Sequence, residues 1–113
     1  MRFIHKLLLA VVIILLSFAW TSPVFADNNG DRIFTNNCSS CHLGGGNILI
    51  ANKTLHKEAL SQYLDNYNTE SIQAIIHQIK NGKGAMPAFK NKLNEEEILE
   101  VAAYVFQKAE QGW

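Results

Sequence analysis

The chain is short of several features that mark large classes of protein. Only 18% of its 113 residues are charged, and ten Lys and Arg balance ten Asp and Glu, so the formal net charge is +0. Without a basic excess or an acidic block, the charge pattern indicates neither a nucleic-acid partner nor a solvating tail. The two cysteines allow one disulfide at most, and the length allows one domain, which excludes a multidomain enzyme. What the chain does have is 48% hydrophobic residues, too many for an intrinsically disordered protein.

The longest hydrophobic run lies near the N-terminus and is itself short. It covers residues 7–20, after a basic start without acidic residues. Roughly 14 residues are fewer than the ~20 that cross a bilayer, and in residues 23–26 small residues stand at the two positions that a signal peptidase inspects. We therefore expect a cleaved signal peptide at residues 1–26 and a secreted domain at residues 27–113. An uncleaved membrane anchor is the alternative.

Four stretches of the secreted domain have the pattern of short helices, and none alternates as a strand does. The expected helices cover about residues 30–37, 57–66, 70–81 and 94–109. Three successive glycines and a single internal proline place the segments between them in long loops. The pattern therefore predicts an all-α fold with long loops that need something to pack on.

Local signals predict the ends and buried faces of these helices. Asn94 and Glu97 form a capping-box pattern, and Gly82 supplies a stop for the third helix. Caps are also expected at Asp27 or Asn28 for the first helix and at Thr54 for the second. The expected buried faces of the third and fourth helices are Ile72, Ile75, Ile76 and Ile79, and Ile98, Leu99, Ala102, Val105 and Phe106.

Both cysteines lie in one motif that carries chemistry. Cys38, Ser39, Ser40, Cys41 and His42 form a C-x-x-C-H pattern, which is typical of covalent attachment of a c-type haem. Two cysteines at this spacing can reach the two vinyl groups on one edge of the porphyrin as thioethers. The adjacent histidine is then brought under the iron as an axial ligand. We expect Cys38 and Cys41 to hold the haem and His42 to bind its iron.

Three other interpretations of the motif fit less well. A thioredoxin-like redox pair would start a helix in a βαβ context, and no strand precedes this motif. A zinc site needs four ligands, yet His56 and His77 are far apart and lack the required spacing. A plain disulfide is possible in an exported protein, but it would leave His42 and the glycine-rich loop without a purpose.

The other axial ligand is expected to be a methionine. Once Met1 leaves with the signal peptide, Met86 is the one thioether left, in a loop where Pro87 favours extended backbone at the preceding residue. Met86 could instead be a simple core filler. The rival ligands His56 and His77 are expected to be exposed, because one flanks a helix start and the other lies off the isoleucine face.

An iron held by His42 and Met86 has a higher reduction potential than one held by two nitrogen ligands, and it has no position open to oxygen or peroxide. That predicts an electron carrier and not an enzyme. The rival is an enzyme or gas sensor with a five-coordinate haem, in which Met86 only packs.

Several longer stretches resemble the cytochrome c6 family. They are residues 52–55, residues 81–89 and the C-terminal residues 101–113, with the pair Gly30 and Phe34 expected to face Tyr104 on the last helix. The resemblance covers essentially all of the secreted domain. It implies a class I cytochrome c fold, with about four short helices and long loops around one covalently bound haem c.

The resemblance also implies a function and a place. The family carries single electrons from the cytochrome b6f complex to photosystem I in the thylakoid lumen of cyanobacteria and algae. For this chain we expect a cyanobacterial or plastid-encoded origin, because a nucleus-encoded plastid protein would need a longer transit segment before the signal. A periplasmic or respiratory cytochrome c donating to a cytochrome oxidase is the alternative. By the same resemblance, Gln78 would lie beside the haem and keep its potential high. Lys92 and Gly46 depart from the arginine and asparagine that the family commonly has there.

Overall fold

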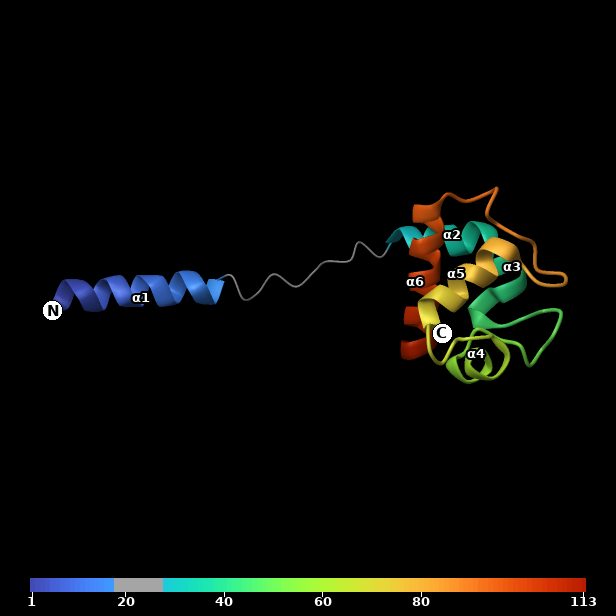
Figure 1. The fold of residues 1–113 in the computed structure, drawn as a ribbon, viewed down its shortest axis with the longest axis horizontal. Coiled ribbons are helices and arrows are strands. Elements are labelled where there is room, and N and C mark those ends of the chain that lie inside the picture. Colours follow the sequence, from blue (N-terminus) through green and yellow to red (C-terminus); the bar gives the residue numbers. More distant parts are fainter. Residues whose placement is uncertain (18–27) are drawn as a thin grey trace.

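The computed structural model describes residues 1–17 and 28–113, and its ribbon shows helices joined by long loops (Figure 1). The helices are α1 (Arg2–Ser17), α2 (Asn28–Asn37), α3 (Ser39–His42), α4 (Lys57–Tyr63), α5 (Ser71–Asn81) and α6 (Glu95–Gln111), with the 3-10 turn η2 (Leu43–Gly45) after α3. Within the described ranges there is no strand, and the expected all-α class is confirmed.

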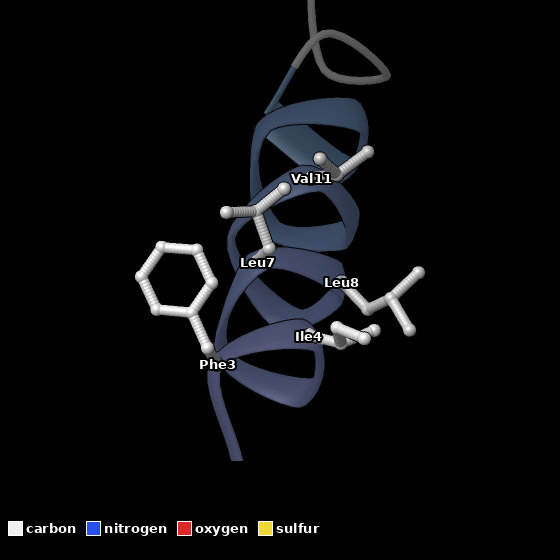
Figure 2. Close-up of a pocket in the computed structure, with 5 residues that line it drawn as sticks. All are labelled: Phe3, Ile4, Leu7, Leu8 and Val11. Carbon is white, nitrogen blue, oxygen red and sulfur yellow. The ribbon is translucent and has the colours of Figure 1, made fainter. Parts of the chain in front are cut away.

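Helix α1 coincides with the expected signal segment. All of its described side chains are exposed, and Figure 2 shows five of them, every one apolar, projecting from the helix. Sixteen residues of helix extend about 24 Å, which is less than the hydrocarbon core of a bilayer. In the part of the chain that the structure describes, no helix is both long and apolar enough to cross a membrane. The expected cleavage point after Ala26 and the expected cap Asp27 lie outside the described residues.

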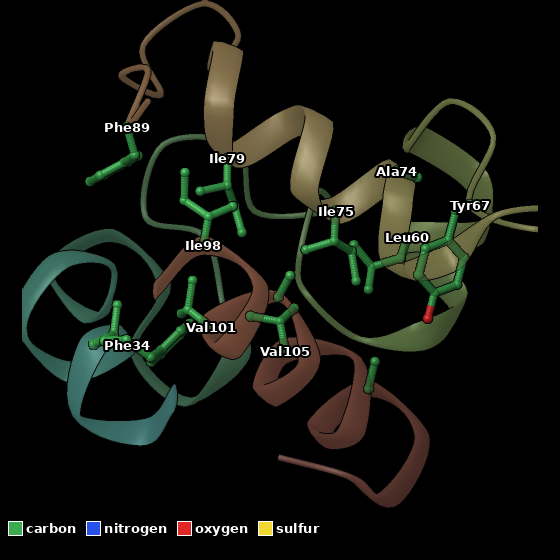
Figure 3. Close-up of a cluster of buried hydrophobic side chains, with 13 residues drawn as sticks. Phe34, Leu60, Tyr67, Ala74, Ile75, Ile79, Phe89, Ile98, Val101 and Val105 are labelled. Carbon is green, nitrogen blue, oxygen red and sulfur yellow. The ribbon is translucent and has the colours of Figure 1, made fainter. Parts of the chain in front are cut away.

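The core forms where α6 packs against both α2 and α5 (Figure 3). Ile98, Val101 and Ala102 of α6 are at most 1% exposed, so this helix is the centre of the packing. The rest of the buried cluster is Ile33, Phe34, Leu60, Tyr67, Ala74, Ile75, Ile79, Phe89, Val105 and Ala109.

Helices α2 and α6 cross closely, as the family resemblance predicted. A Cβ atom on Gly30 would lie 2.6 Å from the Glu100 carbonyl oxygen and 2.8 Å from Cβ of Tyr104. One turn further on, the rings of Phe34 and Tyr104 have centroids 5.4 Å apart. Because Gly30 has no side chain, α6 can approach α2 closely there, and the rings of Phe34 and Tyr104 fill the space beside the crossing.

The first half of the secreted domain corrects the expected boundaries. Helix α2 ends at Asn37 as expected, but the one-turn helix α3 and the turn η2 follow where only loop was expected. Helix α4 ends at Tyr63 and not near residue 66. Thr54 does not cap it: its hydroxyl accepts a hydrogen bond from the His56 N–H at 3.3 Å, and His56 is the N-cap.

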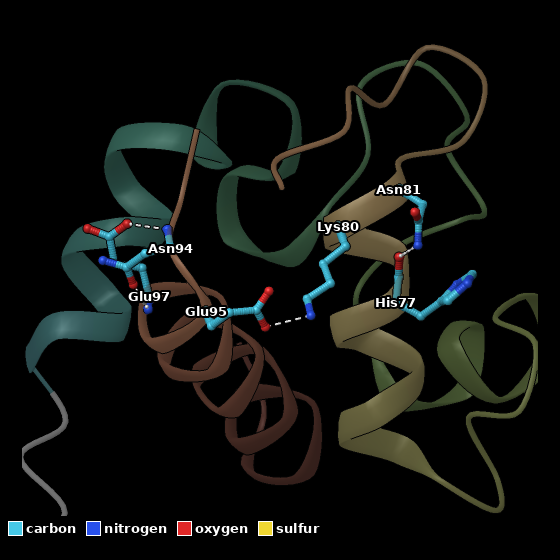
Figure 4. Close-up of polar contacts among 6 residues, drawn as sticks. All are labelled: His77, Lys80, Asn81, Asn94, Glu95 and Glu97. Carbon is cyan, nitrogen blue, oxygen red and sulfur yellow. Dashed lines mark hydrogen bonds and ion pairs between the residues drawn. The ribbon is translucent and has the colours of Figure 1, made fainter. Parts of the chain in front are cut away.

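The last two helices follow their local signals more closely. Asn94 accepts from the Glu97 N–H at 2.8 Å, Glu97 accepts from the Asn94 N–H at 2.9 Å, and Lys80 pairs with Glu95 at 2.6 Å (Figure 4). The capping box is therefore confirmed, and Gly82 ends α5 as expected.

The expected buried faces were partly wrong. Leu99 is 51% exposed, while Val101 is fully buried. The reason is that α6 has partners on two sides, which bury positions that a single apolar stripe does not include. On α5, Ile75 and Ile79 are buried, whereas Ile72 and Ile76 are only half-buried.

Candidate functional site

A cavity of about 500 Å³ opens beside the core, in the size range of cofactor sites. Its walls come from separate segments: the 38–42 motif, the 47–55 loop, α4, α5, the 83–89 loop and α6. Every site residue expected from the sequence lines it, namely Cys38, Cys41, His42, Gln78 and Met86. The structure thus brings together residues that lie up to 48 positions apart in the chain.

Local folding places the three motif residues on one wall. The Cys38 N–H donates to the Phe34 carbonyl at 2.8 Å and continues α2, and the His42 N–H donates to the Cys38 carbonyl at 2.9 Å. One helical turn thereby puts positions i, i+3 and i+4 on the same side. Both cysteines are free thiols, and burial, with a smaller effect of Cys41, raises the pKa of Cys38 to about 11. At neutral pH the Cys38 side chain is therefore an uncharged thiol.

His42 has a fixed orientation. Its Nδ1 lies 2.8 Å from the carbonyl oxygen of Gly46, and because a carbonyl only accepts, Nδ1 carries the proton. The lone pair is then on Nε2, which has no hydrogen-bond partner within the described residues. A histidine that donates from one ring nitrogen and offers the other is the usual arrangement of a metal-binding imidazole.

Met86 reaches the cavity from a tightly folded loop. Lys83 and Met86 exchange two backbone hydrogen bonds of 3.0 Å, and the Phe89 N–H donates to the Ile79 carbonyl at 2.9 Å. Gly82, which starts the loop, has a φ of +64°, and a Cβ atom there would collide with the backbone of Met86 to Ala88. The loop conformation thus depends on this glycine.

Gln78 contacts the same sulfur. Its Nε2 donates to the Sδ atom of Met86 at 3.7 Å, from one turn before the end of α5. The amide holds the half-buried thioether in place and leaves a sulfur lone pair free, because sulfur has two.

Several cavity residues were not expected from the sequence. Asn47 accepts from the N–H groups of Leu49 and Ile50 at 2.9 Å and donates to the Lys53 carbonyl at 3.0 Å, so its side chain folds the loop. Asn after glycines is a common turn former, which was the available signal. Tyr63 also lines the cavity, and its hydroxyl accepts from Asn52 at 2.9 Å, a long-range contact that no local pattern indicates.

His56 and His77 are both exposed, and neither lines the cavity. Their expected exposure is confirmed. The carbonyl of His77 accepts a hydrogen bond from the Asn81 side chain at 2.9 Å at the end of α5 (Figure 4). Among the histidines of the described ranges, His42 alone faces the cavity.

Known proteins share both the sequence and this arrangement. The family model described as cytochrome c oxidase, cbb3-type, subunit III matches residues 25–105. Cytochrome c6 of Gloeothece citriformis is 47% identical over 114 residues, covering 96% of this chain and 98% of the relative. Cytochrome c6 of Thermosynechococcus vestitus is 48% identical, covering 92% of this chain and 90% of the relative. This chain belongs to the cytochrome c6 family.

Solved structures of the cytochrome c6 family agree in fold. Cytochrome c6 of the diatom Phaeodactylum tricornutum has 50% sequence identity and a TM-score of 0.73, covering 77% of this chain and 98% of that one. Oxidised cytochrome c6A of Arabidopsis thaliana has 29% identity and a TM-score of 0.70, covering 80% and 96%. The class I cytochrome c fold is thereby confirmed.

Membership of the cytochrome c6 family makes the chain an electron-carrying cytochrome whose cofactor is a covalently bound haem c. The residues of the cavity fit that group. Two free thiols, an imidazole with a free Nε2 and a thioether meet around a largely apolar space, which is the donor set that haem c requires.

Proposed function

We propose that Cys38, Cys41, His42 and Met86 hold one haem c in this cavity. The two thiols would hold the haem by thioether bonds, each formed by addition of S–H across a vinyl group with no leaving group. Nε2 of His42 and Sδ of Met86 would bind the iron, and Gln78 would keep Met86 in place by its hydrogen bond of 3.7 Å. The observation that carries this assignment is the convergence of two distant segments, residues 38–42 and 82–89, on one cavity.

The same residues fit a carrier and not an enzyme. Haem iron supplies a one-electron couple between Fe(II) and Fe(III). The protein fixes both axial side chains from well-bonded segments, so the change of charge needs little rearrangement of the chain. With His42 and Met86 both bound to it, the iron would offer no site to a substrate.

The electron route that we propose runs from the cytochrome b6f complex to photosystem I, in the thylakoid lumen. Its support is the family membership, with relatives of cytochrome c6 that match nearly the whole chain. Docking is weak and transient, because fast turnover requires rapid release. The exposed Lys83, Lys90 and Lys92 supply charge near the cavity mouth, where Lys83 lines the cavity.

A respiratory role is the second candidate, because the matching family model is named for a subunit of an oxidase. In it the protein is periplasmic and donates to a cytochrome oxidase. The two candidates share the haem site and differ only in the acceptor, so one experiment separates them.

That experiment is flash-induced absorbance of the reduced holoprotein mixed with photosystem I particles, with an oxidase assay alongside. The mass of the protein first establishes that the haem is attached. Rapid haem oxidation after the flash, with a rate that rises with protein concentration, supports the photosynthetic route. No photo-oxidation beside brisk oxidation by the oxidase overturns it and moves the carrier to a respiratory chain.

We also propose that residues 1–26 are removed on export. The apolar, exposed helix α1 fits the hydrophobic part of a signal peptide. The N-terminal sequence of the protein recovered from the exported fraction decides this point: it starts at Asp27 if the proposal holds. An intact N-terminus in a membrane fraction would instead establish a retained anchor.

A further inference from the structure

The C-terminal tryptophan is tied to the loop that follows the haem motif. Trp113 donates its indole Nε1–H to the Leu55 carbonyl at 3.0 Å, and the Leu55 N–H donates to the Gly45 carbonyl at 2.7 Å. The ring also lies against the backbone of Gly45: a Cβ atom there would lie 2.6 Å from Cδ1 of the indole. One side chain therefore restrains both ends of the 45–55 loop.

The other face of the indole is fixed by the core. Its ring centroid lies 5.2 Å from that of Phe34 on α2 and 6.1 Å from that of Tyr104 on α6. These are the two helices whose close crossing forms the centre of the packing. Trp113 thus connects the rigid helix pair to a loop that has much exposed apolar surface of its own.

The loop segment beneath the indole is also the partner of His42. The residue next to Gly45 is Gly46, whose carbonyl accepts the hydrogen bond from Nδ1 of His42 at 2.8 Å. The Gly46 carbonyl belongs to the 46–47 peptide, and its direction depends on where the preceding 45–46 peptide places Gly46. The indole packed on Gly45 limits that placement. Such an outer hydrogen bond sets the ring orientation and the basicity of a metal-binding imidazole.

We propose that Trp113 is a positioning residue for His42: through Gly45 and Gly46 it holds the carbonyl that fixes the imidazole. The inference rests on the proposed role of His42 as an axial ligand. A well-held Nδ1–H···O bond makes the imidazole a stronger donor, which stabilises Fe(III) and lowers the reduction potential. Loosening the indole therefore weakens this hydrogen bond and raises the potential.

The test uses the reduced holoprotein and Trp113→Phe, which keeps a ring on Gly45 and removes the hydrogen bond to Leu55. Nuclear magnetic resonance first gives the ring-proton shifts of His42 in the unsubstituted protein. Large haem-induced shifts establish His42 as a ligand, and ordinary shifts mean that the proposed coordination, and not the positioning role, has failed. Exchange of the His42 Nδ1–H with solvent and the reduction potential are then measured in the variant.

The matched control is Ile98→Val, a small loss of core packing in α6 at a residue that does not line the cavity. In Trp113→Phe we expect the Nδ1–H to exchange about fivefold faster than in this control, as for the loss of one hydrogen bond, and the potential to rise. If exchange and potential equal those of the control while only the melting temperature falls, Trp113 merely packs and the proposal is wrong.

A second variant reaches the same contact from the loop. Gly45→Ala places a methyl group into the indole ring, adds strain at a residue whose φ is +78°, and should raise the potential in the same direction. Because both changes disturb the contact between the indole and Gly45, the double variant should shift the potential no further than the larger single change. Additive shifts would show two independent effects and overturn the proposal.

Discussion

Met86 is the residue on which the electron-carrier assignment depends, because it separates a closed iron from an open one. We expect Met86→His to lower the reduction potential by on the order of 0.2 V, since a second nitrogen ligand stabilises Fe(III) more than a thioether does. Potentiometric titration of the holoprotein measures the shift. His77→Ala is the control, because His77 is exposed and lies outside the cavity, and its potential should not change. An unchanged potential in Met86→His would show that the methionine only packs.

Gly82 and Gly84 give a matched pair for the loop that carries Met86. Both have positive φ, +64° and +58°, but only at Gly82 would a Cβ atom meet neighbouring backbone, 2.7 Å from the Pro87 carbonyl carbon. Gly84→Ala should cost about 1 kcal/mol for the left-handed conformation, and Gly82→Ala about 3 kcal/mol, because a collision is added. Denaturant unfolding of the two holoproteins gives both values. Equal costs would mean that the collision is relieved without loss and that Gly82 does not fix the loop.

Tyr67 has a buried hydroxyl to which the described residues supply no hydrogen bond. The residue as a whole is 3% exposed. Burial raises the pKa of Tyr67, Glu110 raises it further and Lys57 lowers it. Because the folded-state pKa is above the unfolded one, this residue's contribution to stability is present below about pH 10 and is lost as pH rises through the folded pKa.

Tyr67→Phe should therefore leave the stability at neutral pH equal or up to about 1 kcal/mol higher, since an unpaired polar atom is removed. It should also flatten the loss of stability above about pH 10. Thermal unfolding over a pH series measures both, with Tyr63→Phe as the control that keeps the alkaline loss. A drop of stability at neutral pH in Tyr67→Phe would reveal a partner for the hydroxyl.

At the scale of single elements, α6 begins with a complete capping box. Asn94→Ala removes the acceptor of the Glu97 N–H and should cost about 1 kcal/mol of stability. Thr69→Ala is a fair comparison, because Thr69 is a polar residue just before α5 whose hydroxyl only donates to the Asn66 carbonyl at an exposed site. Its cost should stay within about 0.5 kcal/mol. Chemical denaturation of both variants measures the loss in the free energy of unfolding. Equal losses would show that the capping box contributes no more than any polar residue near a helix start.

The same helix shows what local sequence can and cannot predict. The capping box and the Gly82 stop depend on residues within one turn, and both were predicted correctly. That Val101 is buried and Leu99 is exposed was not predictable, because burial on this helix depends on α2 and α5 packing on two sides of α6. Helix α4 ends early because Asn68 and Ser61 are joined by a hydrogen bond across the following turn, another contact outside the helical period.

The residues of the candidate site also fall into those that local sequence predicts and those that it does not. Cys38, Cys41 and His42 are adjacent in sequence, so their motif predicts their meeting directly. Met86 was inferred by elimination, and its entry into the same cavity had to come from the fold. The contact of Trp113 with Leu55 joins residues 58 positions apart and has no local signal at all.

At the scale of the whole molecule, the cavity is too large for the rest of the chain to support when empty. Two of its walls are loops, and Ile48, Leu49 and Ile50 in one of them are 47–69% exposed. Without the haem, a largely apolar space of about 500 Å³ would be open to water, and the side chains around it would lose the burial that the cofactor provides. Small domains are stable by only about 5–15 kcal/mol, so the covalently held haem is part of the core.

The doubly substituted Cys38→Ser, Cys41→Ser chain should therefore fail to fold cooperatively, because no thioether can hold the cofactor and the loops collapse into the empty space. Far-ultraviolet circular dichroism should show reduced helix content, and heating should give no sharp transition, whereas the holoprotein treated in the same way melts cooperatively. The substituted chain is purified free of haem, which its unshifted mass verifies. A cooperative transition within a few degrees of the holoprotein would mean that α2, α5 and α6 form a self-sufficient core, and that the cavity is a pocket built beside the fold and not within it.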